Sequence, residues 1–301
     1  TVNAANGNIT FTGAIGGTTP LGFLTAKALV STNDISFGST SNFNSASPIT
    51  VIAGRNISLA NTMTNSGTGA VYLRTDYTAT GTGTVTVTTG NITATAGGVN
   101  IYYNPTVFGT QDTIYSGGTT PLKFMLILSL GASNATTTRT LASLSNNSAF
   151  WVLGENFALA ANIDATETST WNFNGSIYNG FNPIGTTTGY RGNFDGLGYS
   201  ITNLYINRPT IASVALFYSV ISTGSAVPIV FRNLSVINAN IIAGSGASQG
   251  GIIAGSFIAN TAVINVSNLY ASGTLTDSVG GGYFGGIAGV LGQGGLGAIT
   301  A

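Results

Sequence analysis

Short segments with apolar residues at every second position fill the first hundred residues of the chain. Residues 7–11, 33–37 and 55–59 share one pattern, in which an isoleucine is followed two positions later by phenylalanine or leucine. This alternation places the apolar side chains on one face of a β-strand. The three isoleucines are 26 and 22 residues apart, about one turn of a β-solenoid. We therefore predict a stack of short strands in this part of the chain.

A longer repeat follows near the C-terminal end. An Asn-Leu pair recurs at 203–204, 233–234 and 268–269, and a Gly-Gly-Ile segment recurs at 250–252 and 285–287. The leucines are 30 and 35 residues apart, and the glycine segments are 35 residues apart. A fixed period of this size indicates a solenoid, in which each unit buries the apolar face of its neighbour. We expect the glycines at tight corners, with positive φ and close approach between backbones.

These patterns predict an all-β protein, a parallel β-solenoid, in three parts. Residues 1–105 would form turns of about 22–26 residues, and 149–301 would continue the solenoid with glycine-rich repeats of about 35 residues. Between them, residues 106–148 are expected to form a loop and a small insertion. The insertion, around 121–147, lacks strand alternation. We expect it to be non-β, with short helical turns at a set of leucines: Leu126, Leu130, Leu141 and Leu144.

The composition narrows the possible partners. Charged residues make up 5% of the 301 residues, eight Lys and Arg balance eight Asp and Glu, and histidine and cysteine are absent. Low charge favours self-association or adhesion, and the lack of a basic patch argues against nucleic acid. The longest apolar run, 122–130, is far shorter than the roughly 20 residues of a membrane-spanning helix. We predict no membrane span in this segment.

A series of segments in a fixed order resembles filamentous-haemagglutinin-type bacterial adhesins. It comprises residues 69–74, 98–105, 157–165, 181–185 and 194–204. The Gly-Gly-Ile-x-Ala-Gly units are similar to the glycine-rich GLUG repeats of bacterial surface proteins. The resemblance implies a right-handed parallel β-helix, export by a two-partner or autotransporter-like route, and a role in attachment or biofilm. It implies no catalytic residues.

The export domain of those adhesins carries an Asn-Pro-Asn motif, whereas this chain has Asn104-Pro105-Thr106. We therefore expect a section of the rod, with both ends lying inside a longer chain. The expected location is extracellular or on the bacterial cell surface.

Enzymatic function has little support in the sequence. Parallel β-helices include polysaccharide-degrading enzymes, which need two carboxylates about 5 to 10 Å apart. Asp164 and Asp195, 31 residues apart, could pair across turns of the solenoid, but both lie beside turn residues, where Asp usually bonds its own backbone. Triads that require His or Cys cannot form. We predict no enzyme, no cofactor and, without a calcium-binding repeat, no metal site.

The asparagines of the Asn-x-Ser/Thr sequences could have either of two roles, in glycosylation or in the packing of the strands. Eight Asn-x-Ser/Thr sequons occur, and five of them lie at strand starts, where Asn can form ladders between turns of the solenoid. We favour ladders over glycans at these five positions: Asn8, Asn56, Asn91, Asn233 and Asn265.

The candidate binding surface is a polar loop, residues 166–180, in which Trp171 and Tyr178 are the notable aromatic residues. The expected partner is a host or bacterial cell surface, with carbohydrate as one candidate ligand. The function predicted is a secreted, non-catalytic adhesin or rod section. The main alternative is a self-assembling extracellular filament subunit that associates end to end through open strand edges. A polysaccharide-degrading enzyme is the less favoured alternative.

Overall fold

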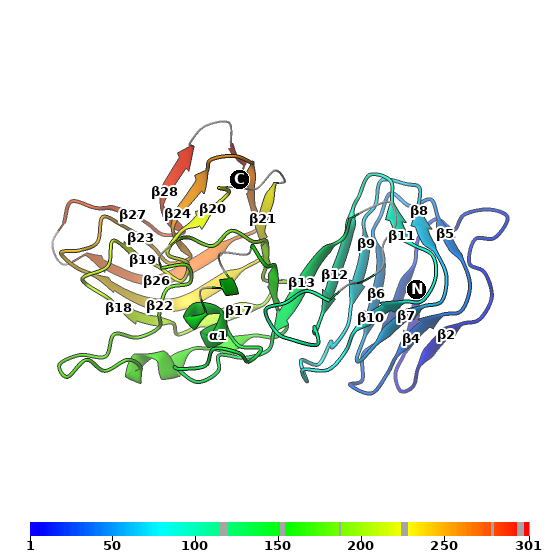
Figure 1. Ribbon diagram of the computed structural model, residues 1–301, viewed down its shortest axis with the longest axis horizontal. Helices are drawn as coiled ribbons and strands as arrows, with labels where there is room; N and C mark the ends of the chain where they lie inside the picture. Colours follow the sequence, from blue (N-terminus) through cyan, green and yellow to red (C-terminus); the bar gives the residue numbers. More distant parts are fainter. Residues whose placement is uncertain are drawn as a thin grey trace. The chain divides into compact units, whose positions relative to one another are not determined.

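The computed structural model describes the whole chain except residues 113, 115–119, 148, 151–153, 187, 224–227, 278–279, 294–297 and 301. It divides into two compact units, Thr1–Leu126 and Ile127–Ala301. Both are built mainly from parallel strands (Figure 1), so the all-β prediction is confirmed. The three parts predicted from the sequence, with boundaries at residues 105 and 148, were defined by the length and type of their repeats. These boundaries stay a prediction.

The described strands of the first unit form three parallel sheets. Their orders are β1-β3-β6-β9-β12-β13, β2-β4-β7-β10 and β5-β8-β11. One pass of the chain through the sheets is here called a coil, and the coils that begin with β3, β6 and β9 contribute one strand to each sheet. The strands are β1 (Val2–Ala4), β2 (Ile9–Phe11), β3 (Thr25–Ala28), β4 (Ile35–Phe37), β5 (Ser41–Phe43), β6 (Ile49–Ala53), β7 (Ile57–Leu59), β8 (Met63–Asn65), β9 (Val71–Arg74), β10 (Val85–Val87), β11 (Ile92–Ala94), β12 (Val99–Tyr103) and β13 (Leu122–Ile127).

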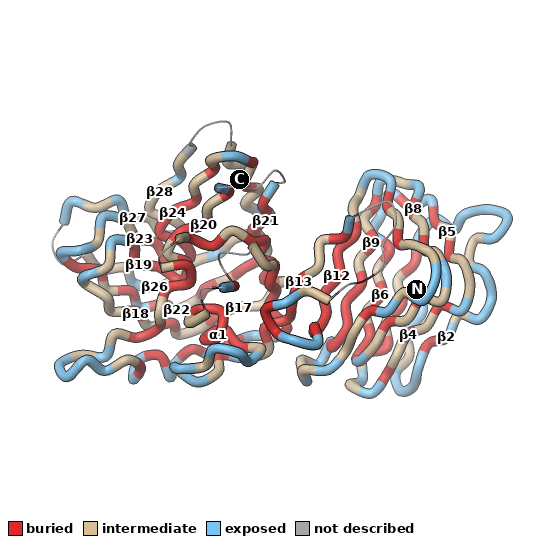
Figure 2. Tube along the Cα trace, viewed as in Figure 1, coloured by how far each residue is buried: buried red, intermediate tan, exposed pale blue. Residues whose placement is uncertain are grey.

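The predicted isoleucine column is confirmed by the strand register. Ile9 pairs with Ile35, Ile35 with Ile57, and Ile57 with Val85. All four side chains are buried, and the buried residues line the inside of the coils (Figure 2). Apolar side chains two positions apart therefore stack into one continuous core, as expected for strands that alternate between inside and outside.

A polar ladder runs beside this column on the outside of the unit. The backbone N–H of Asp34 donates to Asn8 Oδ1 at 2.8 Å, that of Asn56 to Asp34 Oδ1 at 2.9 Å, and that of Thr84 to Asn56 Oδ1 at 3.1 Å. Each side chain thus bonds the backbone of the next coil. Asn8 and Asn56 occupy the ladder positions predicted for them.

The expected non-β insertion at 121–147 is wrong in its first part. Residues Leu122–Ile127 form β13, which pairs with β12 in parallel. Residues 124–127 are all buried, so the strand lacks the inside-outside alternation from which the other strands were predicted. The expected helical turn exists as α1 (Leu141–Asn146), which Thr140 caps by accepting a hydrogen bond from the N–H of Ser143.

The described strands of the second unit form four parallel sheets. The orders are β14-β16-β21-β25-β29, β15-β17-β22-β18 with β26 on β22, β19-β23-β27 and β20-β24-β28. The elements are β14 (Phe157–Leu159), β15 (Ile163–Asp164), η1 (Thr166–Thr170), β16 (Phe194–Asp195), β17 (Ser200–Thr202), β18 (Tyr205–Asn207), β19 (Ser213–Val214), β20 (Val220–Ile221), β21 (Ile229–Arg232), β22 (Ser235–Ala243), β23 (Gln249–Gly251), β24 (Ala254–Ala259), β25 (Ile264–Ser267), β26 (Tyr270–Asp277), β27 (Tyr283–Gly285), β28 (Ala288–Gln293) and β29 (Ile299–Thr300).

The additional sheet explains the longer repeat. Hydrogen-bonded positions of neighbouring coils are 34 to 40 residues apart here, against 22 to 28 along the ladder of the first unit. Leu204 and Leu234 are 30 residues apart, and the prediction that they occupy equivalent positions of successive coils is wrong. Tyr205 pairs with Asn240, and Ser200 pairs with Ser235, so the two leucines follow different corners of the coil. Both corners use an Asn with positive φ before a buried Leu, which is why the pattern recurs twice within one coil.

The Gly-Gly-Ile glycines allow close packing, but the expected positive φ is wrong for them. Gly250, Gly251 and Gly255 are absent from the residues with positive φ. A Cβ on Gly255 would lie 1.7 Å from Ser213 Oγ, and one on Gly251 would lie 2.3 Å from the carbonyl oxygen of Ala254. No side chain fits at such distances, so glycine is required by the approach of neighbouring segments.

Phenylalanine and tyrosine rings fill the interior of the second unit. Phe194 stacks on Phe231 with 5.5 Å between ring centroids, and Phe217 meets Phe231 edge to face at 5.0 Å. Tyr190 is fully buried, and its single hydroxyl proton is shared between the carbonyl oxygens of Asn193 at 2.7 Å and Glu155 at 3.0 Å. Burial raises the pKa of this phenol well above its usual value. Ring pairs of this kind stabilise the core beyond their buried area.

Candidate functional site

A groove of about 590 Å³ crosses the outer face of the sheet that contains β17, β18, β22 and β26. All of its lining residues are uncharged. They are Thr166, Ser169, Asn203, Tyr205, Asn238, Ala239, Asn240, Gly273 and Thr274.

The floor of the groove is formed where two successive coils turn in the same way and the next coil departs from regular register. Asn203 lies between β17 and β18 with φ 60°, and Asn238 lies within β22 with φ 56°. Gly273 of β26 has φ 145°, and the register between β22 and β26 shifts at this point. Asn tolerates the left-handed region better than most residues, because its short side chain can hydrogen-bond locally. The turns at Asn203 and Asn238 and the irregularity at Gly273 lie next to one another and line the groove.

A ladder of side-chain amides runs along this floor. Asn238 Nδ2 donates to Asn203 Oδ1 at 2.8 Å. Asn203 Nδ2 in turn contacts Asp164 Oδ1 at 3.1 Å and Thr166 Oγ1 at 3.0 Å. A second ladder of the same kind lies at another corner, where Asn268 Nδ2 donates to Asn233 Oδ1 at 3.0 Å. The ladder role predicted for Asn233 is therefore confirmed.

One wall of the groove is a column of polar side chains in strand register. Tyr205 pairs with Asn240, and Asn240 pairs with Thr274. The Thr274 hydroxyl donates to Asn240 Oδ1 at 3.3 Å. Asn240 and Thr274 are exposed, and Tyr205 is half-buried. The wall thus presents hydroxyl and amide groups to solvent at the spacing of neighbouring coils.

The short helix η1 closes one end of the groove. The buried Thr168 hydroxyl donates to the carbonyl oxygen of Ala165 at 2.6 Å and accepts the N–H of Tyr205 at 2.9 Å. These bonds fix η1 against β18. The helix thereby holds Thr166 and Ser169 at the groove.

A second hollow of about 470 Å³ shares Thr166 with the groove. It differs in charge, because two acidic residues, Asp164 and Glu167, line it. Hydrogen bonds from the Thr166 hydroxyl, Asn203 Nδ2 and the Thr166 N–H lower the pKa of Asp164 below its usual value. Asp164 is therefore ionised at neutral pH.

The two predicted carboxylates have separate structural partners. Asp164 lies in β15, which pairs with β17, whereas Asp195 lies in β16, which pairs with β14 and β21. Asp195 is buried and accepts hydrogen bonds from Arg232 Nε at 2.7 Å, Asn233 Nδ2 at 3.0 Å and the N–H of Leu197 at 2.9 Å. The structural role expected for both residues agrees with these contacts. The described residues contain no group of three His, Cys, Asp or Glu side chains that could hold a metal ion.

The predicted binding loop contains a small hairpin beside the groove. Trp171 is 8% exposed and stacks on Phe181, so its predicted place at the surface is wrong. Its carbonyl oxygen accepts the N–H of Gly180 at 3.1 Å, which closes the hairpin. Tyr178 is 44% exposed and lies 4.9 Å from the ring of Phe173, which is 58% exposed.

Phe173 was missed from the sequence. It pairs with Tyr178 in an antiparallel bridge. The Asn174-Gly175 turn between them is a hairpin signal that could have indicated this arrangement. The base of the hairpin contacts the groove wall, because the N–H of Phe181 donates to the carbonyl oxygen of Tyr205 at 2.9 Å.

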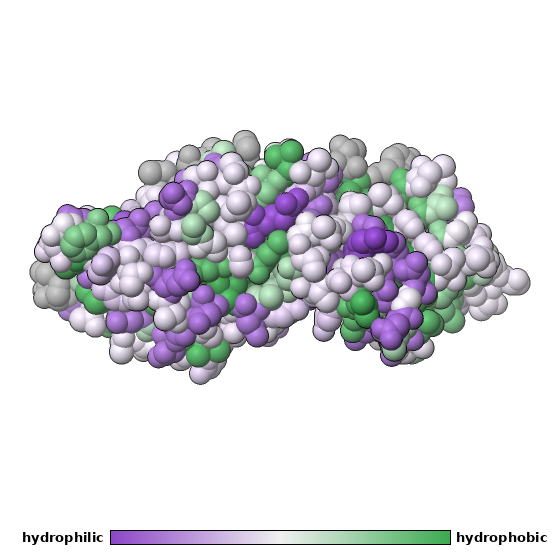
Figure 3. Space-filling model, turned by 90° about the horizontal axis from the view of Figure 1, so that it is seen from below, coloured by the Kyte–Doolittle hydropathy of each residue, from purple (hydrophilic) through white to green (hydrophobic). Residues whose placement is uncertain are grey.

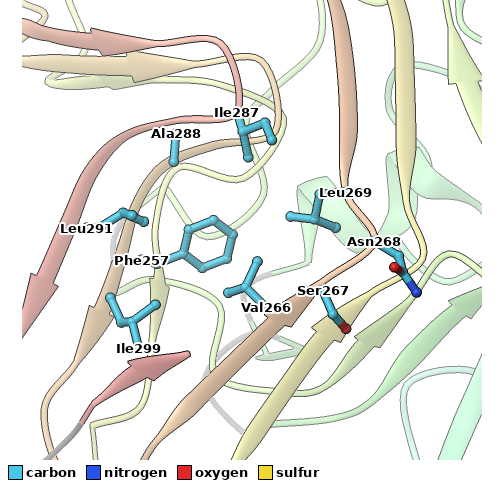
Figure 4. Close-up of a pocket in the computed structure, with 9 residues that line it drawn as sticks. All are labelled: Phe257, Val266, Ser267, Asn268, Leu269, Ile287, Ala288, Leu291 and Ile299. Carbon is cyan, nitrogen blue, oxygen red and sulfur yellow. The ribbon is translucent and has the colours of Figure 1, made fainter. Parts of the chain in front are cut away.

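An apolar hollow of about 440 Å³ lies elsewhere in the second unit, between β24, β25 and β28. The side chains of Phe257, Leu269 and Ile287 point into it (Figure 4). Phe257 is buried and pairs with Val220 on one side and Leu291 on the other. Leu291 is 65% exposed. The hollow is therefore the space between the parallel sheets at the last described coil, and we assign it no ligand.

The fold and the groove define a parallel all-β repeat protein with an uncharged polar surface groove. The face seen in Figure 3 mixes hydrophilic and hydrophobic residues in small areas. Among the described residues, no helix has the length and apolar character to cross a membrane.

Comparison with known proteins gives one partial similarity. The chain is 33% identical over 134 residues to halomucin of Haloquadratum walsbyi, and the match covers 42% of this chain and 1% of that protein. No family model and no solved structure matches.

Proposed function

We propose that this chain is a non-catalytic section of an extracellular or cell-surface adhesin, a right-handed parallel β-helix that serves attachment or biofilm formation. The observation that carries the proposal is the in-register stacking of coils around a continuous core, with an uncharged, Asn-rich groove on the outside. Right-handedness follows from the strong preference of parallel crossover connections. The similarity to part of halomucin supports a place at the cell surface.

The mechanism is geometric. Backbone hydrogen bonds between coils run along the axis at about 4.8 Å per strand, and side-chain ladders reinforce them at the corners. Such a stack holds the groove and the hairpin at residues 171–180 in fixed positions. Low net charge permits close approach to another surface without strong repulsion.

The attachment function is tested by immobilising the purified chain and measuring how many host or bacterial cells it retains under flow. We expect retention above that on a surface coated with the heat-denatured chain. Replacing the exposed pair, Phe173→Ser with Tyr178→Ser, should reduce retention several-fold, because exposed aromatic residues carry much of the energy of surface contacts.

The control for this variant is Tyr270→Ser with Tyr283→Ser, which removes two exposed aromatic residues, 57% and 71% exposed, outside the hairpin. Retention should stay near that of the unchanged protein. Absence of retention for every cell type, with the protein folded, would exclude the attachment function.

A self-assembling filament is the second candidate, favoured by the exposed interior column at Leu291. In this case copies of the chain would associate through the edges of β26, β27 and β28, since open strand edges template further pairing. Sedimentation velocity at increasing concentration should then reveal growing species, and Leu291→Asp should abolish them. A single species across the whole concentration range would exclude the filament.

A further inference from the structure

We propose that the groove formed by Asn203, Asn238 and Gly273 binds an uncharged glycan chain lying along the axis of the coils. The inference rests on the proposed attachment function and names the class of ligand that this part of the surface recognises.

The polar groups of the groove match those of a sugar. Within the described part of the chain, the Oδ1 of Asn238, the Nδ2 of Asn240 and the hydroxyl of Tyr205 have no protein partner, while the remaining amide groups hold the ladder. An amide supplies separate donors and acceptors, and a hydroxyl supplies both. Glycan hydroxyl and acetamido groups offer the same combination. The ring of Tyr205 adds an apolar face at the wall.

The shape favours a chain over a single small molecule. Polar side chains of different kinds recur at the same register position of each coil, at about 4.8 Å along the axis, as Tyr205, Asn240 and Thr274 do on one wall. The second hollow lies next to the groove and shares Thr166 with it. A ligand with repeating polar groups can therefore contact several coils at once.

The charges favour an uncharged ligand. No Lys or Arg lines either hollow, and the charged side chains that do are Asp164 and Glu167. The Asp164 carboxylate, which accepts a hydrogen bond from Asn203 Nδ2 of the groove floor, places a negative charge beside the groove. A sulfated or carboxylated glycan, like a nucleic acid, would be repelled there.

A peptide is the less suitable occupant. Extended peptides bind by adding a strand to a free sheet edge. The strand under the groove, β22, is paired on both sides, with β17 and β18 on one and β26 on the other. Recognition at this place must come from side chains.

The test uses the folded 301-residue chain and fluorescently labelled hexasaccharides of glucose, mannose and N-acetylglucosamine, with binding measured by fluorescence anisotropy. The variant is Asn238→Gly, which removes the amide while glycine keeps the positive φ. The matched control is Asn268→Gly, which removes an amide with the same backbone conformation and the same ladder bond outside the groove.

At least one of the three hexasaccharides should bind, and Asn238→Gly should weaken it about tenfold, as expected for the loss of hydrogen bonds to one side chain. Asn268→Gly should leave the affinity within about twofold. A sulfated hexasaccharide of equal length should bind more weakly than the uncharged one.

The inference is overturned if none of the three uncharged hexasaccharides binds, if the two variants lose affinity equally, or if the sulfated probe binds best. Cell retention separates this failure from that of the attachment function. Retention that persists in Asn238→Gly would leave attachment standing without the glycan groove.

Discussion

Replacing Ile252 with Asp should lower the free energy of unfolding by about 4 kcal/mol or more, since an unpaired charge would be buried in the core. Ile252 is 4% exposed. Its backbone joins three coils, because its N–H donates to the carbonyl oxygen of Gly286 and its own carbonyl oxygen accepts the N–H of Leu216. Chemical denaturation followed by circular dichroism measures the change.

The control is Ile287→Asp, at the same position of the Gly-Gly-Ile motif one repeat later. Ile287 lines the apolar hollow but is 40% exposed, so its carboxylate would keep part of its hydration and the loss should be clearly smaller than for Ile252→Asp. Equal losses in the two variants would show that burial inside the coil does not decide the effect. An unchanged melting temperature for Ile252→Asp would contradict the observed orientation of this residue.

Removing the carboxylate of Asp195 should cost about 3 kcal/mol of stability, because three hydrogen-bond donors lose a charged acceptor, although the Arg232 side chain is 27% exposed and stays partly hydrated. Asp195 is 1% exposed and joins its own turn to the next coil through Arg232 and Asn233. In Asp195→Ala the guanidinium of Arg232, the amide of Asn233 and the N–H of Leu197 all lose an acceptor. Thermal and urea unfolding measure the loss.

The first unit offers a matched control, because Asp34 and Arg55 also form an ion pair between coils at 2.7 Å. Their side chains are 29% and 44% exposed, so solvent screens the pair, and Asp34→Ala should cost about 1 kcal/mol or less. The hydrogen bond from Arg55 lowers the pKa of Asp34. That small contribution is therefore present above the unfolded-state pKa and is lost as pH falls through the folded-state pKa. A similar cost for both substitutions would contradict the role of burial.

Regular alternation made the first unit predictable. Ile9, Ile35 and Ile57 recur with the same polar flanks, and the structure pairs all three in one column. The same criterion failed at β13, where Phe124 to Ile127 are buried on both faces and no alternation exists. The recurring Asn-Leu pair was also misleading. Asn203-Leu204 and Asn233-Leu234 lie at two different corners of the coil, and the sequence did not distinguish them because both corners need the same residue types.

The groove could be predicted only in part. Asn203 and Asn238 are 35 residues apart, which equals the coil length, so their contact follows once that length is known. The neighbouring wall is different, because Tyr205, Asn240 and Thr274 share no residue type and come together only through strand pairing. Trp171 was misplaced because a polar loop sequence does not reveal that a hairpin folds its first residue inward.

Coils that pass through three sheets and coils that pass through four advance equally along the axis, about 4.8 Å each, yet they contain very different lengths of chain. A coil of 22 residues extends to about 75 Å when pulled straight, and one of 35 residues to about 120 Å. Under tension, the loss of one large coil would therefore release far more slack than the loss of a small one. In the proposed attachment function, the glycine-rich repeats would lengthen the connection most for each coil that unfolds.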